Sequence, residues 1–128
     1  MLVLDSGAVS FLAARSRQAL ATLQVFSRQG WWPPMVPTAV LVESLTGHPG
    51  RDATTNKLLQ GCRVEPAPSE ALARRAALLR TAAGRGSAVD ALVVAAAEPG
   101  GVALTSDPDD LGALAGYARA VRIVTLGR

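Results

Sequence analysis

Five acidic residues lie at the edges of the most apolar segments of this 128-residue chain. Asp5, Asp107 and Asp110 follow apolar runs, Asp90 begins one, and Glu43 lies inside one. Removing a carboxylate from water costs several kcal/mol unless it is paired or binds a metal ion. Carboxylates gathered in one place also repel one another, and a shared divalent cation removes that repulsion. Oxygen ligands of this kind select Mg²⁺ or Mn²⁺, so the five acids indicate a candidate metal site.

Each of these acids also has an ordinary structural interpretation. Asp5 could cap the helix that follows it, and Glu43 could lie on the solvated side of a surface helix. The segment from Ser87 to Asp90 fits a capping box, and Asp107 precedes a proline as a helix N-cap does. What favours a common site is the order of the acids: strand end, mid-helix, helix start and strand end.

Other kinds of catalytic site find little support in the composition. His48 and Cys62 are the only histidine and the only cysteine of the chain. The chain therefore forms no internal disulfide, no metal site rich in His or Cys, and no Ser-His-Asp triad. We predict that His48 is a loop residue and that Cys62 is a buried structural thiol.

Short apolar segments alternate with helical ones along the whole chain, and this alternation has to position the acids. It predicts a parallel sheet with helices on both faces, a three-layer α/β/α fold in one domain spanning 1–128. In such sheets ligands bind beyond the carboxyl ends of the strands, where Asp5 and Asp107 are expected. The expected strands are 2–5, 35–36, 62–65, 102–105 and 122–126. The expected helices are 7–14, 16–29, 38–46, 53–60, 69–83, 87–98 and 108–115.

The charge distribution favours a polyanionic ligand. The net charge is +3, and the five acids above are half of the ten Asp and Glu, set against 13 Lys and Arg. A basic body with clustered acids suits a polyanion whose chemistry needs cations, although a generic basic surface explains the total equally well. We expect no signal peptide, and no apolar run reaches membrane-spanning length, so we expect a soluble, cytoplasmic protein.

Four segments together resemble the PIN-domain ribonucleases, and most closely the VapC-type toxins of bacterial toxin–antitoxin pairs. They are Val3–Ser6, Val42–Ser44, Val89–Val93 and Leu104–Leu111. The resemblance rests on their order and spacing and covers essentially the whole chain. It implies a parallel sheet with strand order 3-2-1-4-5, Mg²⁺- or Mn²⁺-dependent endonucleolytic cleavage of RNA, a homodimer, and a small antitoxin protein whose tail covers the acid pocket.

The resemblance also assigns roles to individual residues. Asp110 matches a further acid often found after the last one, and Ser6 and Thr105 match hydroxyl positions near the metal ions. Gly7 departs from the family, which frequently has a small hydroxyl or Asn there. The metal-binding and catalytic acids map to Asp5, Glu43, Asp90 and Asp107. In the mechanism expected from this, Glu43 binds a second metal ion or orients the attacking water, and the three aspartates are the main ligands.

Basic and aromatic residues give weaker indications of RNA contacts. Arginines near the ends of predicted elements could hold backbone phosphates, although each is also an ordinary solvated residue; they are Arg15, Arg17, Arg51 and Arg85. Trp31 and Trp32 could stack on bases. Their position next to two prolines favours a role as core or interface anchors.

Several other functions are compatible with parts of this pattern. A PIN-domain nuclease with no toxin role, or a catalytically silent RNA-binding module of this fold, would look much the same. A phosphorylated receiver domain would need a second acid near Asp5, an Asp at the third strand and a lysine at the last strand, whereas Lys57 is the only lysine. A phosphatase with Asp5 as nucleophile would need a second acid where Gly7 stands.

Overall fold

A five-stranded parallel sheet forms the centre of the molecule. The computed structural model describes residues 1–66 and 68–126. The sheet has the order β3-β2-β1-β4-β5, which confirms the predicted fold and strand order. This order differs from the 2-1-3-4-5 of flavodoxin-like receivers, which removes the receiver alternative. The strands are β1 (Leu2–Leu4), β2 (Met35–Pro37), β3 (Arg63–Glu65), β4 (Val102–Thr105) and β5 (Arg122–Thr125).

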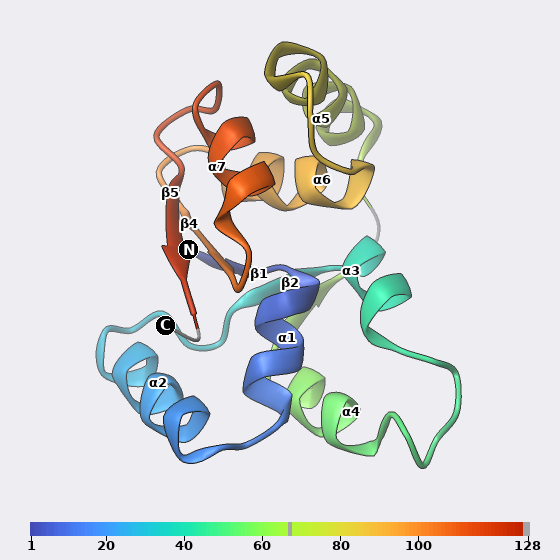
Figure 1. Cartoon of the computed structure of the whole chain (residues 1–128), viewed down its shortest axis with the longest axis vertical. Coiled ribbons are helices and arrows are strands. Elements are labelled where there is room, and N and C mark those ends of the chain that lie inside the picture. The colour runs from blue at the N-terminus through green and yellow to red at the C-terminus, as the bar shows by residue number, and fades with distance from the viewer. Residues whose placement is uncertain (67, 127–128) are drawn as a thin grey trace.

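Helices cover both faces of the sheet, as Figure 1 shows. On one side lie α1 (Ser6–Ala13), α2 (Arg17–Arg28) and α4 (Ala53–Gln60). On the other lie α5 (Glu70–Ala83), α6 (Ala88–Ala97) and α7 (Pro108–Ala115), and α3 (Thr38–Ser44) directly follows β2. No helix of the described residues is both long and apolar enough to cross a membrane.

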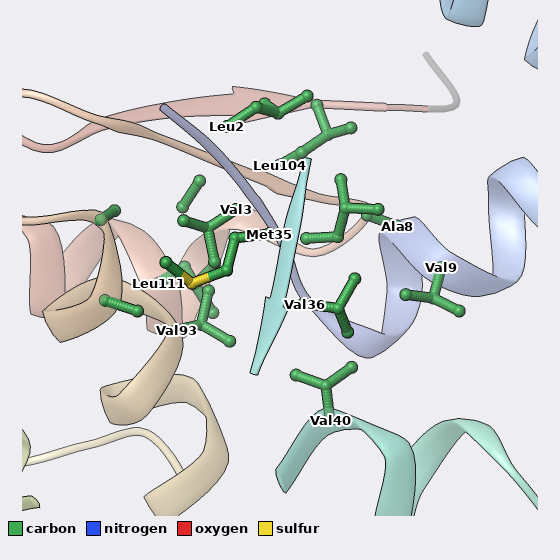
Figure 2. Packing of buried hydrophobic residues seen from close by; sticks show 14 of the residues in the cluster. Leu2, Val3, Ala8, Val9, Met35, Val36, Val40, Val93, Leu104 and Leu111 are labelled. Atoms are coloured by element: carbon green, nitrogen blue, oxygen red, sulfur yellow. The ribbon is translucent and has the colours of Figure 1, made fainter. Parts of the chain in front are cut away.

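Small aliphatic side chains fill both interfaces between the sheet and the helices. Val3 and Met35 lie beside Val93 and Leu111, whereas Val36 lies toward Val40 (Figure 2). β1 and β4 are buried throughout, which explains why their sequences are continuously apolar rather than alternating. Because β1 is the central strand, the residues that follow it lie in the middle of the row formed by the carboxyl ends of the strands.

The predicted element boundaries hold to within about one residue, except at the end of α3. The helix expected over 38–46 ends at Ser44 because Leu45 is extended (φ −112°, ψ 148°). The loop beyond it is organised by Asp52, whose carboxylate accepts N–H bonds from Thr46 and Gly47. These bonds lower the pKa of Asp52. Strand β1 stops at Leu4, one residue early, because Asp5 already caps α1.

Candidate metal site

The five candidate acids line a single cavity of about 370 Å³ beyond the carboxyl ends of β1 and β4. Leu4 pairs with Leu104 across these two strands, so the residues that follow them leave the sheet side by side. The acids are therefore gathered at one edge, although they come from distant parts of the chain. The cavity is lined by Asp5, Ser6, Gly7, Glu43, Ser87, Asp90, Ser106, Asp107, Asp110 and Leu111.

Three of the acids stand at the N-termini of helices, so their capping interpretation also holds. Asp5 caps α1 through Oδ1, which accepts the Ala8 N–H at 2.8 Å. Asp90 closes the capping box of α6, where its Oδ2 accepts the Ser87 N–H at 3.1 Å. Asp107 caps α7, where its Oδ1 accepts the Asp109 N–H at 3.4 Å.

Capping and ligand binding are compatible because each cap uses one carboxylate oxygen. The second oxygen of each aspartate takes no part in the cap. The cap also fixes the orientation of the carboxylate, and the partial positive charge at a helix N-terminus stabilises a negative group there. Three helix N-termini thus hold three aspartates around one cavity.

The electrostatics of Asp5 show how crowded the acids are. Its side chain is buried (8% exposed), and this desolvation raises its pKa above the ordinary value. Thr105 and the Ala8 N–H act in the opposite direction, and the negative charges of Asp90 and Glu43 raise the pKa further. Asp5 is thus a buried carboxylate whose desolvation is its main cost, with two further carboxylates near enough to add to that cost, and a bound cation would reduce both.

Glu43 and Asp107 are the exposed acids of the cavity, whereas Asp90 and Asp110 are half-buried. Glu43 lines the cavity and is also exposed, and the adjacent Val42 is 82% exposed, so the solvated side of a surface helix, one of the two expected interpretations, is where Glu43 lies. α3 begins at the carboxyl end of β2, and the side of α3 that faces away from the sheet is in contact with solvent. Asp110, in the first turn of α7, is partly exposed and forms an ion pair with Arg85.

The donor set fits a hard divalent cation, although the side chains do not yet converge on one point. Among the described residues, no three acidic, His or Cys side chains are close enough together to form a ready ligand set. The cavity nevertheless presents carboxylate and hydroxyl oxygens alone, the donors that Mg²⁺ and Mn²⁺ take.

Hydroxyl groups next to the acids help to shape the cavity. Thr105 is fully buried, and its Oγ1 accepts the Asp107 N–H and donates to the Asp107 carbonyl, each at 3.0 Å. It therefore fixes the turn that presents Asp107. A Cβ at position 7 would collide with Ser106 Oγ, so Gly7 leaves space for the Ser106 hydroxyl in the cavity wall.

A second hollow of about 300 Å³ continues from the first across Ser6, Gly7 and Glu43. It extends to Ser10, Ser44 and Thr55 and is mostly polar. Ser44 Oγ is buried there without a hydrogen-bond partner among the described residues. The two hollows together form a polar surface longer than a single ion needs.

The candidate RNA-binding residues are placed very differently from one another. Arg85 bonds a cavity-lining acid, Asp110, which raises the pKa of the arginine. Arg15 and Arg17 lie beyond the far end of α1, roughly 12 Å from the cavity. Arg51 lies in the exposed loop before α4.

The tryptophans belong to the core rather than to the cavity. Trp31 and Trp32 are half-buried and pack against the core. Trp31 stacks on Phe26 with ring centroids 5.7 Å apart, and the Arg122 guanidinium lies 5.8 Å from its ring. This favours their interpretation as anchors over a role in base stacking.

His48 and Cys62 do not line the cavity, whereas two serines that were not predicted as site residues do. His48 lies in an exposed loop, as expected, and the Cys62 thiol is half-buried with its pKa raised by burial to about 11. Ser87 and Ser106 line the cavity without having been predicted to do so. Both lie next to candidate acids at element ends, which is the signal that could have found them.

Comparison with known proteins supports the fold. No family model matches the chain, and no curated protein matches its sequence. The crystal structure of FitAcB from Neisseria gonorrhoeae is similar, with a TM-score of 0.65 and 16% sequence identity. The match covers 95% of this chain and 96% of that chain. Together with the strand order, this likeness defines the class of the molecule: a three-layer α/β/α protein of PIN-like fold.

Proposed function

We propose that this protein is a Mg²⁺- or Mn²⁺-dependent endoribonuclease and the toxin component of a toxin–antitoxin pair. The observation that carries the proposal is the gathering of Asp5, Glu43, Asp90, Asp107 and Asp110 around one cavity at the carboxyl edge of a PIN-like sheet. The resemblance of the four short motifs to VapC-type toxins supports the choice of RNA as substrate and the toxin role.

In this mechanism the residues of the chain bind and orient. Asp5, Asp90 and Asp107 would hold the metal ion, with their carboxylates oriented by the helix caps. Glu43, exposed at the rim, would bind a second ion or orient the attacking water. When bound, the metal ion would supply activation of water and stabilisation of the charge that develops on the phosphate.

The extent of the polar surface and the basic net charge of the chain support an extended polyanion as ligand. The second hollow continues the acid cavity along Ser10, Ser44 and Thr55, so the polar surface extends beyond a single ion site. The chain also carries a net charge of +3 despite its acid cluster. A basic body attracts RNA, and a cation in the cavity would offset the local negative charge.

The decisive test is cleavage of single-stranded RNA by the purified protein. We expect cleavage with Mg²⁺ or Mn²⁺, none in EDTA, and recovery when metal is restored. Asp90→Asn should lower the rate by at least about 100-fold, since changes to residues that merely support metal ligands cost 10- to 100-fold. The amide can still accept the Ser87 N–H, so the fold should persist by circular dichroism.

The matched control is Asp109→Asn, which removes the same charge from an exposed residue of α7 outside the cavity lining. Its rate should equal that of the wild type. Full activity in chelator, or an active Asp90→Asn protein, would contradict the proposal. Metal binding and RNA binding without cleavage would favour the alternative, a silent RNA-binding module of this fold.

The toxin role requires a separate observation. We expect production of the wild-type protein in a bacterial host to arrest growth and Asp90→Asn not to. A small antitoxin protein encoded next to this chain should bind it and restore growth, and the protein should purify as a homodimer. A cleaving protein that leaves growth unaffected would instead be a PIN-domain nuclease with another role.

A further inference from the structure

One basic side chain contacts the acid cavity from the loop between α5 and α6. Arg85 Nε donates to Asp110 Oδ1 at 2.8 Å, and Asp110 lines the cavity. The ion pairs of the described residues are three, and the other two lie elsewhere, between Arg74 and Glu70 and between Arg75 and Glu98. Arg85 is thus the cation that the fold pairs with an acid of the cavity.

The backbone holds Arg85 in place from both sides. Gly84 ends α5 in the left-handed conformation (φ 68°), and Gly86 has φ 96°. Any side chain at position 86 would collide with Leu114, and the Gly86 carbonyl accepts a 3.0 Å hydrogen bond from Arg80 Nε. The next residue, Ser87, then caps α6. The loop that carries Arg85 is therefore fixed relative to Asp90, three residues into that cap.

Stability does not account for this ion pair. The side chains of Arg85 and Asp110 are 54% and 45% exposed, and ion pairs at such exposure contribute little to folding. Nε alone makes the bond, so the N–H groups of both terminal amino groups take no part in it. An arginine held by one edge in this way keeps a planar set of donors suited to a phosphate group.

An incoming RNA phosphate faces an electrostatic obstacle that Arg85 can remove. The phosphate must approach a cavity lined by five carboxylates, and an arginine at its rim supplies the opposite charge. The guanidinium bonded to Asp110 Oδ1 puts a full positive charge beside this carboxylate, which disfavours a metal cation at its second oxygen. The backbone N–H groups that bond Asp5, Asp90 and Asp107 carry no such charge.

We propose that Arg85 binds a backbone phosphate of the RNA at the mouth of the acid cavity, and that Asp110 is a positioning residue that orients Arg85 rather than a metal ligand. This inference rests on the proposed function. It assigns Asp110 a role different from that of Asp5, Asp90 and Asp107.

The binding arm of the test uses a fluorescently labelled single-stranded RNA of mixed sequence and full-length protein carrying Asp90→Asn, which prevents cleavage. Adding Arg85→Gln should weaken binding about tenfold and reduce the slope of log K against log salt by about 0.7, the loss of one phosphate contact. Asp110→Ala, which removes the acceptor of the Arg85 Nε–H bond, should weaken binding in the same direction, and it should add nothing once Arg85→Gln is present. The matched control is Arg74→Gln, an exposed arginine of α5 away from the cavity, which should leave affinity and slope unchanged.

The metal arm uses titration of Mn²⁺ alone into otherwise wild-type protein. Asp110→Asn should bind Mn²⁺ within about twofold of the wild type, whereas Asp5→Asn should lose at least about tenfold. The inference is overturned if Arg85→Gln binds RNA as tightly as the Arg74→Gln control, or if Asp110→Asn loses Mn²⁺ affinity as Asp5→Asn does. A wild-type protein that binds RNA through Arg85 but never cleaves it would overturn the proposed hydrolysis alone.

Discussion

Asp5 and Glu98 are both buried carboxylates, yet the fold treats them in opposite ways. Asp5 (8% exposed) has acids as its charged neighbours, and its pKa is raised. The Glu98 side chain (7% exposed) receives two 2.8 Å bonds from Arg75 and one of 2.7 Å from the Arg119 N–H. The Arg75 guanidinium holds the pKa of Glu98 below its usual value.

The two environments lie at opposite ends of one helix. α6 carries Asp90 in its first turn, facing the cavity, and Glu98 just after its last residue. A buried acid that has its own arginine is part of the structure, whereas a buried acid whose charged neighbours are acids is, in the proposed function, one that binds a cation. The partner of a buried charge, rather than burial itself, separates the two roles.

Removing the paired acid should have the larger effect on folding. We expect Glu98→Gln to lower the free energy of unfolding by about 2 kcal/mol, because Arg75 loses its charged partner while remaining largely covered. Since folding lowers the pKa of Glu98, its contribution is present above the ordinary value of 4.5 and is lost as the pH falls through the lower folded pKa. Urea unfolding at neutral and acidic pH measures this, and equal stability of both proteins at pH 7 would refute it.

Binding of a metal ion at the acid cavity should stabilise the folded protein. At ten times its Kd, Mn²⁺ should raise the free energy of unfolding by about 1.4 kcal/mol in the wild type and not in Asp5→Asn. The gain requires charged Asp5, so it is present above the raised pKa of this carboxyl and lost as the pH falls through it. Thermal unfolding with and without Mn²⁺ tests this, and an equal gain in Asp5→Asn would contradict it.

Without metal, the contribution of Asp5 to stability depends on pH in the opposite direction. A raised folded pKa favours the fold at low pH, and that contribution is lost as the pH rises through the folded value. The Asp5→Asn protein without metal should therefore melt above the wild type at neutral pH, and the difference should vanish below the ordinary pKa of 3.8. Asparagine also caps helices well, so no loss of α1 offsets this gain.

The exposed pair between Arg74 and Glu70 provides the smallest effect. Its side chains are 77% and 81% exposed, so Glu70→Gln should change the free energy of unfolding by at most about 0.5 kcal/mol. The same urea experiment measures it beside Glu98→Gln. A loss as large as that of Glu98→Gln would mean that burial does not distinguish these pairs.

The sequence was sufficient for the fold because local and global signals agree. Continuous apolar runs predicted β1 and β4 as buried parallel strands, and Ser69 and Ser87 marked helix starts that the structure confirms with side-chain caps. The gathering of Asp5 and Asp107 followed from strand ends alone.

Side-chain detail at the site could not be predicted in the same way. The sequence left open whether Glu43 faces a site or solvent, because apolar neighbours such as Val42 can themselves be uncovered on a surface helix. The bond between Arg85 and Asp110 joins residues 25 positions apart, and no periodicity encodes such a contact. Whether the acids converge depends on their rotamers, which the pattern of residue types does not determine.

The scattered origin of the cavity walls has a consequence for synthesis on the ribosome. Its acids come from segments that begin near residue 5 and end near residue 110, and they meet only when β4 pairs with β1. A growing polypeptide that has not yet released β4 and α7 cannot assemble the site, however well its first half folds. In the proposed function, the protein would therefore remain inactive during translation until the segment through α7 has left the ribosome.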